Sequence, residues 1–252
     1  MHHASASQNL PVLTCPPYPS AKPNASLFPA LFFLSLFKSR HSPRWAEKSG
    51  GPNTAANVHS PEGIASAAHG FAAFSRRTVS CKPFIAAVVG GAYGGGVEML
   101  LNCDLVISAD DATFALPEVK VGVTAVAGGI PRLVSIAGRQ LASEMLLLGR
   151  TVTAQEAYTR FGFVNKLVPK DNVLAEALAW ASALVRDSSP DAVQSTKRGV
   201  TLACQHGDVD TATVEHARSP ESVRHFAGEN MKEGLKAFGE KRRPRWTNPA
   251  KL

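Results

Sequence analysis

The sequence has few cysteines, and none lies close to another. The 252 residues include four, without any C-x-x-C spacing: Cys15, Cys81, Cys103 and Cys204. This distribution argues against a zinc site or a disulfide framework and is typical of proteins in a reducing compartment. We therefore expect four free thiols and no metal site.

Long apolar runs are also absent. The longest, Leu27 to Phe37, is interrupted by Pro29 and Ser35 and falls short of the ~20 apolar residues that cross a bilayer. We expect no membrane span. The run resembles a signal-peptide core, and the acid-free, serine-containing start resembles a transit peptide, so a targeting role for this region stays open, mitochondrial import among the alternatives.

Acidic residues are missing from the first 46 positions, which contain four basic ones: Lys22, Lys38, Arg40 and Arg44. The remainder of the chain has 23 basic and 20 acidic side chains, so most of the net charge of +7 comes from this start. A nucleic-acid surface would need clustered basic residues with aromatic residues between them. We expect no nucleic-acid partner, whereas a phosphorylated small ligand is compatible with the charge.

Composition divides the chain into four parts. Residues 1–44 contain seven of the 17 prolines and seven serines without a helical or alternating period, which is typical of a poorly ordered segment. Residues 45–190 have the alternating pattern of an α/β core, 191–246 are predicted to be helical, and 247–252 form a tail. We find no internal repeat.

Two apolar runs of strand length lie in the core, Phe84–Val89 and Leu105–Ala109, and both predict strands that are covered on two faces. Ser60-Pro61-Glu62 is a typical helix start, and that helix should extend to about Arg77. Strands followed by helices indicate an α/β fold with a helical C-terminal region. The other predicted helices are Gly95–Cys103, Arg139–Leu148, Thr153 to Gly162, Val173–Arg186, Pro190–Cys204 and Gly228–Glu240.

Three successive glycines, Gly94, Gly95 and Gly96, follow the first strand and open a helix. They leave the backbone without Cβ atoms where a ligand could approach. The first N–H groups of a helix lack internal partners, so the Gly95 N–H could donate to a developing oxyanion. A tight turn without any ligand is the alternative.

Two carboxylates follow in apolar surroundings, Glu98 in the first turn of that helix and Glu118 after Leu116-Pro117. A helix rising 1.5 Å per residue and a strand returning over ~16 Å would let both face one ligand. Paired carboxylates in a partly dry pocket can divide into a general acid and a general base. None of the eight histidines lies beside a Ser or Cys nucleophile.

The segment KPFIAAVVGGAYGGGVEMLLNCDLVISADDATFALPEVKVGVTAVAGGIPRL resembles the signature region of the crotonase superfamily, the enoyl-CoA hydratase/isomerase family. The resemblance continues through LLLGRTVTAQEAYTRFGFVNKLV and ENMKEGLKAFGEKRRPRW. It extends from about residue 60, or from 45 if Trp45-Ala46-Glu47 is included, to 246. It implies a spiral of ββα turns, with C-terminal helices that build trimers, often paired into hexamers.

The resemblance also implies a site and a reaction. Family members bind acyl-CoA thioesters and hold the thioester oxygen with two backbone N–H groups, and Gly95 matches the second donor. Glu98 and Glu118 match the acids that hold a water and add it across the Cα=Cβ bond of a 2-enoyl-CoA. Glu98 would help activate the water, and Glu118 would orient it and protonate Cα.

Five further residues are implied as substrate or CoA contacts: Gly94, Gly96, Gly122, Phe238 and Lys241. Phe238 and Lys241 match positions that contact the CoA adenine and its phosphate, often across a subunit boundary. By itself, the basic stretch Lys241 to Arg245 is more typical of a solvated surface. Coenzyme A belongs to the substrate, so no separate cofactor is expected.

The chain departs from the family before Trp45. Two or three strands, a helix and a loop with the first oxyanion donor are expected there, but residues 1–44 do not match them, so the first strands are predicted to be missing or replaced by an atypical or truncated N-terminus. A catalytically silent protein that binds acyl-CoA or joins oligomers therefore remains an alternative. Among enzymes the alternative is enoyl-CoA isomerase, although the resemblance implies that isomerising members commonly keep only one of the two acids.

The last residues, Ala250-Lys251-Leu252, resemble the Ser-Lys-Leu address of peroxisomal proteins. An import receptor reads this address at a free C-terminus. We therefore expect the peroxisome as location and its import receptor as a partner.

Overall fold

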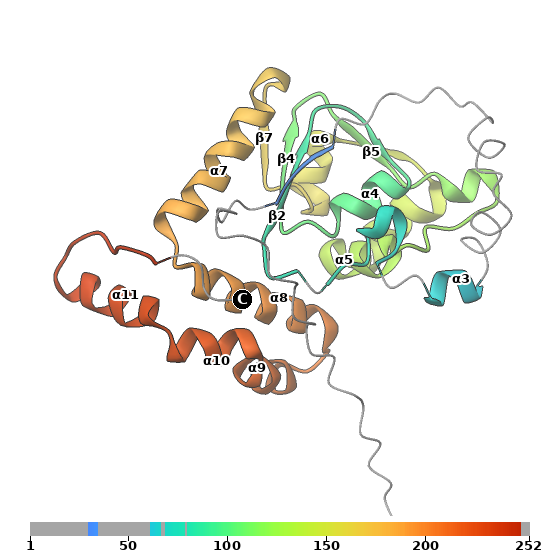
Figure 1. Cartoon of the computed structure of the whole chain (residues 1–252). Helices are drawn as coiled ribbons and strands as arrows, with labels where there is room; N and C mark the ends of the chain where they lie inside the picture. Colours follow the sequence, from blue (N-terminus) through green and yellow to red (C-terminus); the bar gives the residue numbers. More distant parts are fainter. Residues whose placement is uncertain (1–29, 35–60, 67–68, 79, 248–252) are drawn as a thin grey trace, which may run out of the picture.

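The fold was examined in a computed structural model, which describes residues 30–34, 61–66, 69–78 and 80–247. Two small sheets lie among helices α4 to α7, and a layer formed by helices α8 to α11 lies beside them (Figure 1). The strands are β1 Ala30–Leu34, β2 Phe84–Val88, β3 Ala92–Tyr93, β4 Leu105–Ala109, β5 Thr113–Ala115, β6 Thr151–Thr153 and β7 Lys166–Val168.

Helices and single helical turns complete the described part of the chain. They are α3 Pro61–Ser66, η1 Phe71–Ala73, α4 Gly95–Leu100, η2 Glu118–Val121, α5 Gly129–Leu148, α6 Ala154–Glu156, η3 Ala157–Phe161, η4 Lys170–Asn172, α7 Val173–Asp187, α8 Pro190–Gln205, α9 Val209–Arg218, α10 Pro220–Ala227 and α11 Glu229–Gly239. None of the described helices has both the length and the hydropathy of a membrane span.

The larger sheet has the strand order β1-β2-β4-β7, and all its neighbours are parallel. Every residue of β2 is buried, and Ile85, Val88 and Ile107 are fully inaccessible. Parallel strands are normally covered on both faces, which is why they read as continuous apolar runs. The predicted strands at Phe84–Val89 and Leu105–Ala109 are confirmed to within one residue.

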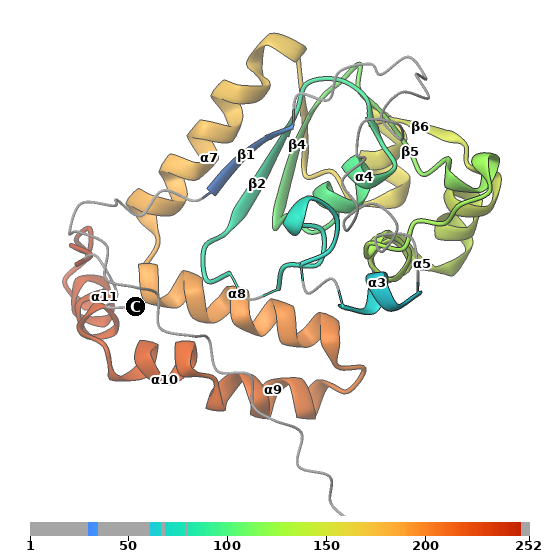
Figure 2. The same cartoon turned by 45° about the vertical axis from the view of Figure 1, so that its right-hand side comes forward.

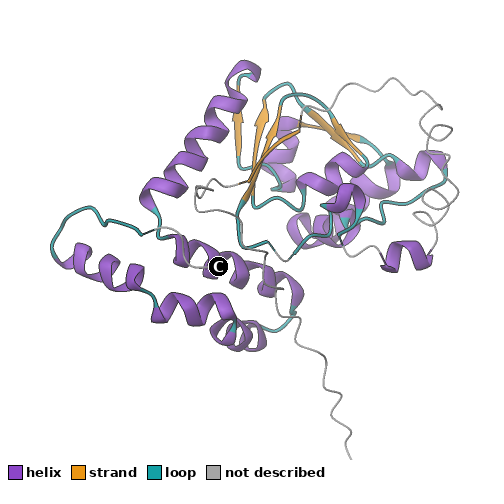
Figure 3. Ribbon diagram, in the orientation of Figure 1, coloured by secondary structure: helices purple, strands orange, loops and turns teal. Residues whose placement is uncertain are grey.

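The smaller sheet, β3-β5-β6, shows how the chain winds. β2 lies in the larger sheet, β3 in the smaller one, and α4 follows; β4 and β5 repeat this path and lead to η2 and α5. Strands of the two sheets are distinguished from the surrounding helices in Figure 3. This is the predicted spiral of ββα turns, and it places α4 and η2 at equivalent positions in successive turns.

Residues 30–34 form β1, which pairs in parallel with β2 from Ala30↔Phe84 to Leu34↔Val88. They lie in the segment 1–44, for which the sequence predicts poor order and family strands that are missing or replaced. β1 is compatible with a replaced strand, and the order of the remainder of this segment stays a prediction. β1 also gives β2 a neighbour on the side that would otherwise be an open sheet edge.

Helix lengths differ from the predictions at two places where the backbone turns left-handed. The predicted helix from Ser60 to Arg77 is wrong in extent, because α3 ends at Ser66 and Ala72 and Ala73 have φ of 53° and 54°. Conversely, α5 begins ten residues before the predicted Arg139. Gly138, with φ 77°, separates its two halves, and only the second half was predicted.

The C-terminal layer contains two helices that were not predicted, α9 and α10. Asp208 caps α9, and Ser219 caps α10 with Pro220 at the first helical position. Ser219-Pro220-Glu221 has the same form as the helix start Ser60-Pro61-Glu62, so the signal was present. Figure 2 shows α8, α9 and α10 running below the sheets, with α11 at the end of this layer.

Candidate active site

The turn between β3 and α4 is built around Gly94. Its φ of 55° and ψ of −126° are accessible to glycine and strained for other residues. The Gly94 N–H donates to the Ala115 carbonyl at 2.9 Å, and its own carbonyl accepts from the N–H groups of Val97 and Glu98. Because Ala115 ends β5, this bond joins the glycine turn directly to the strand that leads to Glu118.

Gly95 and Gly96 are the first residues of α4. Among the described residues, no acceptor lies within hydrogen-bonding distance of the Gly95 N–H. The initial N–H groups of a helix lie at the positive end of its dipole. The Gly95 N–H is therefore free to donate a hydrogen bond to a ligand oxygen, and its role as an oxyanion donor stays a prediction.

Glu98 is 4% exposed and held by backbone donors. Its Oε1 accepts from the Ala127 N–H at 2.8 Å and the Gly129 N–H at 3.0 Å. Burial raises the pKa of Glu98, while these two hydrogen bonds and the charge of Arg132 act in the opposite direction. A buried carboxylate with a raised pKa is suited to accept a proton.

Glu118 begins η2 and has the less satisfied side chain of the two. Its Oε2 is buried, and no hydrogen-bond partner is found for it among the described residues. Burial raises the pKa of Glu118, and the charge of Glu98 raises it further. A nearby like charge disfavours the ionised form of a carboxyl group, which is the direction of this effect.

Each carboxylate lies against a glycine, and the missing Cβ atom leaves the space that the carboxylate needs. A Cβ placed on Gly94 would lie 3.2 Å from Glu118 Oε1, and a Cβ on Gly129 would lie 2.9 Å from Glu98 Cγ. Any side chain at these positions would press on one of the acids. The site thus combines an available N–H group with one buried and one half-buried carboxylate, an arrangement that suits acid and base chemistry beside a developing oxyanion.

Gly122 lies at the end of η2, where it takes φ 76°, and a Cβ there would meet no atom within 4 Å. It therefore borders open space next to Glu118, as expected of a residue along a binding cleft. Apolar side chains near it are unusually exposed for their type: Val119, Val121, Val123 and Val126. They offer apolar surface close to the carboxylates.

Phe238 and Lys241 are not brought to this site within one subunit. Phe238 lies on α11 and is 86% exposed, and Lys241 follows that helix with φ 54°. In Figures 1 and 2, α11 lies at the opposite end of the molecule from α4 and α5. The two residues can take part in the predicted site only if they come from another subunit.

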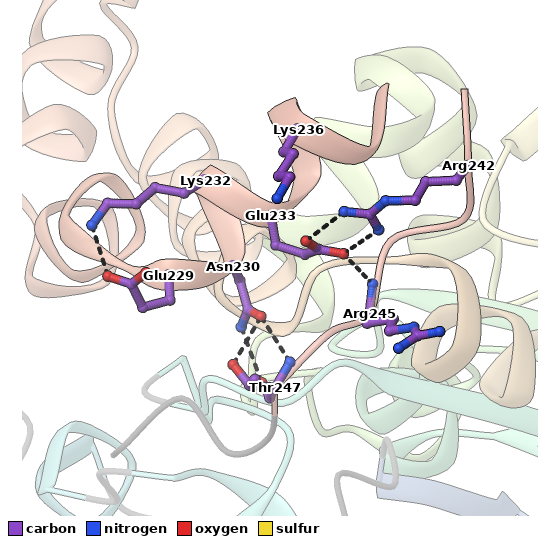
Figure 4. A pocket seen from close by; sticks show the side chains of 8 residues that line it. All are labelled: Glu229, Asn230, Lys232, Glu233, Lys236, Arg242, Arg245 and Thr247. Carbon is purple, nitrogen blue, oxygen red and sulfur yellow. Dashed lines mark hydrogen bonds and ion pairs between the residues drawn. The ribbon is translucent and has the colours of Figure 1, made fainter. Parts of the chain in front are cut away.

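A polar cavity of about 660 Å³ lies between α11 and the chain that follows it (Figure 4). Glu233 binds both Nη atoms of Arg242, at 2.6 and 2.9 Å, and accepts from the Arg245 N–H. Asn230 holds Thr247 through its side-chain oxygen. These bonds attach residues 242–247 to α11, so this cavity is a structural junction far from Glu98.

The donors that hold Glu98 were not recognised from the sequence. Gly128 and Gly129, at the start of α5, lie within the segment that carries the resemblance, but the bond of the Gly129 N–H to Glu98 is a contact across 31 residues. Ser75 was also missed; its Oγ donates to the Ala127 carbonyl at 2.6 Å and supports the same loop.

Other predictions concern residues outside the site. Cys81, Cys103 and Cys204 are free thiols, and burial raises the pKa of Cys103 to about 12, which makes this thiol unreactive. No group of three potential metal ligands was found among the described residues. Cys15, the tail Ala250-Lys251-Leu252 and the predicted position of the first oxyanion donor before Trp45 lie outside the described residues.

Comparison with known proteins gives the family. Residues 59–249 match the enoyl-CoA hydratase/isomerase family. The chain is 45% identical over 189 residues to mevalonyl-coenzyme A hydratase of Aspergillus fumigatus and 48% identical over 181 residues to that of Beauveria bassiana. These alignments cover 73% and 71% of this chain, and 67% and 63% of the relatives' own length.

Solved structures agree with the sequence relatives. The enoyl-CoA hydratase of Mycobacterium tuberculosis superimposes with a TM-score of 0.64 at 38% identity, covering 70% of this chain and 68% of that one. An enoyl-CoA hydratase of Mycobacterium marinum gives 0.65 at 36% identity, over 76% and 73% of the two chains. The spiral, the glycine turn and the relatives together assign this chain to the enoyl-CoA hydratase/isomerase family of the crotonase superfamily, as a hydratase-like member.

Proposed function

We propose that the protein adds water across the 2,3 double bond of a 2-enoyl-CoA thioester. The observation that carries this proposal is the buried carboxylate of Glu98 together with the half-buried carboxylate of Glu118, whose Oε2 is itself buried and has no partner among the described residues. A water molecule could satisfy that oxygen. Isomerisation needs only a proton transfer, so two acids favour hydration.

In this reaction Glu98 accepts a proton from the water as its oxygen bonds to Cβ. Glu118 orients the water and gives a proton to Cα, which saturates the double bond. The negative charge that develops on the thioester oxygen is stabilised by the Gly95 N–H. Glu98 then holds the water's proton and Glu118 is ionised, and proton exchange through solvent restores both groups. No cofactor is required besides the coenzyme A of the substrate.

The acyl group of mevalonyl-CoA is a second candidate for the substrate class. The two relatives named mevalonyl-coenzyme A hydratases are 45% and 48% identical to this chain, whereas an Escherichia coli 2,3-dehydroadipyl-CoA hydratase is 38% identical. This difference favours a branched six-carbon acyl group with a terminal hydroxyl. Hydration would form the mevalonyl thioester from its 2,3-unsaturated precursor, so a comparison of kcat/KM for that unsaturated thioester and for crotonyl-CoA would decide between them.

The full chain provides the test. With a short 2-enoyl-CoA, we expect disappearance of the conjugated double bond, and a loss of ~10²- to 10⁴-fold in kcat for Glu98→Gln and for Glu118→Gln. Unchanged rates in both variants would refute the mechanism. A shifted double bond in the product would identify an isomerase, and acyl-CoA binding without turnover would identify a silent acyl-CoA-binding protein.

A homotrimer, or a hexamer of two trimers, would complete the site. In this assembly Phe238 and Lys241 of one subunit contact the CoA adenine and phosphate bound by another. The apolar exposure of α9 to α11 supports association: Val209, Val223, Phe226, Leu235 and Phe238 are all more than half exposed. Light scattering that gives a monomer at enzyme concentrations used for turnover would contradict this arrangement.

The terminal Ala250-Lys251-Leu252 supports a peroxisomal location through the import receptor. Mitochondrial import remains the alternative, and a Dictyostelium discoideum relative, 36% identical, is named a probable mitochondrial enoyl-CoA hydratase. A fluorescent protein fused to the N-terminus should mark peroxisomes and become diffuse when the last three residues are deleted. Mitochondrial fluorescence in both cases would favour the alternative.

A further inference from the structure

Arg132, in the first turn of α5, is half-buried and binds neutral partners. Its Nη1 donates to the Ser75 carbonyl at 2.6 Å and to the Gly128 carbonyl at 3.3 Å, and its Nη2 donates to Asn102 Oδ1 at 2.6 Å. No carboxylate lies within ion-pair distance of Arg132 among the described residues. A guanidinium in this setting is costly unless it has a specific function.

Arg132 connects three segments that converge on Glu98. One is the turn at residues 74–77, where the Phe74 and Arg77 carbonyls accept from Asn102 Nδ2. The second is the segment after α4, the helix that carries Glu98; Asn102 lies in this segment. The third is the loop at 127–129, whose N–H groups bind Glu98 Oε1. Each segment contacts Arg132 directly.

The loop at 127–129 is thus held from both sides. Ser75 Oγ binds the Ala127 carbonyl, and Arg132 binds the Gly128 carbonyl, while the Ala127 and Gly129 N–H groups point to Glu98. If the loop moved, the position of Glu98 would change with it, because the two N–H groups are the only hydrogen bonds to its carboxylate found among the described residues.

We propose that Arg132 is a positioning residue for Glu98. It fixes the loop that holds this carboxylate, and its positive charge favours the ionised form of Glu98, in which Glu98 can accept a proton. The proposal rests on the proposed function for its effect on turnover, but its effect on the Glu98 side chain is independent of the reaction.

The electrostatics agree with this geometry. The charge of Arg132 lowers the pKa of Glu98 against the larger effect of burial, and Glu98 in turn raises the pKa of Arg132. The other ionisable groups near this pair are Glu118 on η2, Arg76 after η1, Cys103 after α4 and Cys204 on α8. Removal of the Arg132 charge should therefore leave Glu98 with a higher pKa.

The experiment compares Arg132→Met and Arg132→Lys in the full chain. Arg150→Met serves as the control, because Arg150 also joins elements, through Glu144 and Glu156, but is not among the groups that act on Glu98. For Arg132→Met we expect kcat to fall about 10- to 100-fold with KM almost unchanged, and the acidic limb of the pH profile to move to higher pH. In Arg132→Lys the acidic limb should lie at the same pH as in the wild type, because the positive charge is kept. Its kcat should lie between those of Arg132→Met and the wild type.

Titration of the Glu98 carboxyl by ¹³C NMR gives a readout that does not need turnover. A higher pKa in Arg132→Met, but not in Arg150→Met, supports the proposal even if the reaction is not hydration. An unchanged Glu98 titration and an unchanged pH profile in Arg132→Met would overturn it. If Arg132→Met does not fold, Arg132→Lys decides: wild-type kcat would overturn the positioning role, and reduced kcat at unchanged KM would support it.

Discussion

The carboxylates at the glycine turn and the carboxylates on the outer helices lie in opposite electrostatic environments. Glu98 is buried and Glu118 half-buried, neither forms a salt bridge with another described residue, and burial raises the pKa of both. Glu233 on α11 is bound by Arg242, and Glu156 on α6 by Arg150, and the pKa of each falls to about 2. A carboxylate that must exchange protons near neutral pH cannot be paired with an arginine in this way.

The difference also separates two functions of hydrogen bonding. Glu233 joins Arg242 and Arg245 to α11, and Glu156 forms a capping box with Thr153 at the start of α6. These side chains stabilise local structure. Glu98 instead accepts from two N–H groups that leave its second oxygen available. Glu98 and Glu118 are proposed to act in the reaction, whereas Glu233 and Glu156 hold structural elements together.

The largest expected effect comes from removing one acid of each kind. Glu118→Gln should lower kcat by ~10²- to 10⁴-fold, because the variant cannot give a proton to Cα. Glu233→Gln should leave kcat almost unchanged, because this side chain is not one of the two acids that exchange protons; any loss of the CoA contacts near Lys241 should appear in KM instead. Steady-state hydration kinetics measure both. An equal loss of kcat in the two variants would contradict the proposal that Glu118 takes part in the reaction and Glu233 does not.

A smaller effect is expected when a methyl group presses on an acid. Gly129→Ala places a Cβ 2.9 Å from Glu98 Cγ, so the carboxylate must shift, and kcat should fall about 10- to 100-fold. Gly207→Ala is the control, because a Cβ at that position meets no atom within 4 Å. Wild-type kcat in Gly129→Ala would indicate that the placement of Glu98 is not critical.

For the acids that are bound by arginines, such as Glu156, the expected effect of removal is on stability and depends on pH. Glu156→Gln should destabilise the fold by about 1 kcal/mol at pH 7 through loss of the cap and the ion pair. Since the folded-state pKa of Glu156 is about 2 and the unfolded value is ~4.3, its contribution is complete above pH ~4.3 and fades toward pH 2. Urea unfolding at pH 7 and pH 3.5 measures the change.

Glu229→Gln is the matched control for that measurement. Glu229 pairs only with Lys232 on the exposed surface of α11, where such a pair contributes little. We expect the two variants to differ at pH 7 and to become similar as the pH falls. A constant difference across this range would mean that ionisation of Glu156 is not the cause.

The smallest expected effect is the change in the pKa of Glu118 when the charge of Glu98 is removed. The charge of Glu98 is the second cause that raises the pKa of Glu118. In Glu98→Gln the Glu118 carboxyl should therefore titrate at lower pH than in the unaltered protein, although still above its ordinary value because burial remains. ¹³C NMR of the labelled carboxyl measures this shift, and an unchanged or higher pKa would contradict the proximity of the two acids.

Several of these features could be read from the sequence. The strands at Phe84 and Leu105 were predicted to within one residue, since buried parallel strands are continuously apolar. The glycine turn and its two acids were also recognised. The path between the acids was predicted less well: two strands, β4 and β5, return the chain, and the parallel pairing of β3 with β5 brings the segments together.

The predicted strands and helices differ from the structure where contacts between distant segments, and not the local sequence pattern, decide the conformation. The segment around Ala30 contains no alternation that distinguishes a strand, and pairing with β2 is what makes it one. The predicted helix after Ser60 was too long, because the left-handed residues Ala72 and Ala73 have no distinctive sequence signal. The helix start at Ser219-Pro220 was present in the sequence but was overlooked.

The sequence by itself determined the types of most elements and the family resemblance, and it suggested the two acids, because strands, helix caps and glycine turns each depend on a few adjacent residues. Only the tertiary structure decided how the acids are held. The contacts of Glu98 with Ala127 and Gly129, and those of Arg132 with Ser75 and Asn102, join segments 29 to 57 residues apart. Such contacts arise from the winding of the spiral, which no local pattern encodes.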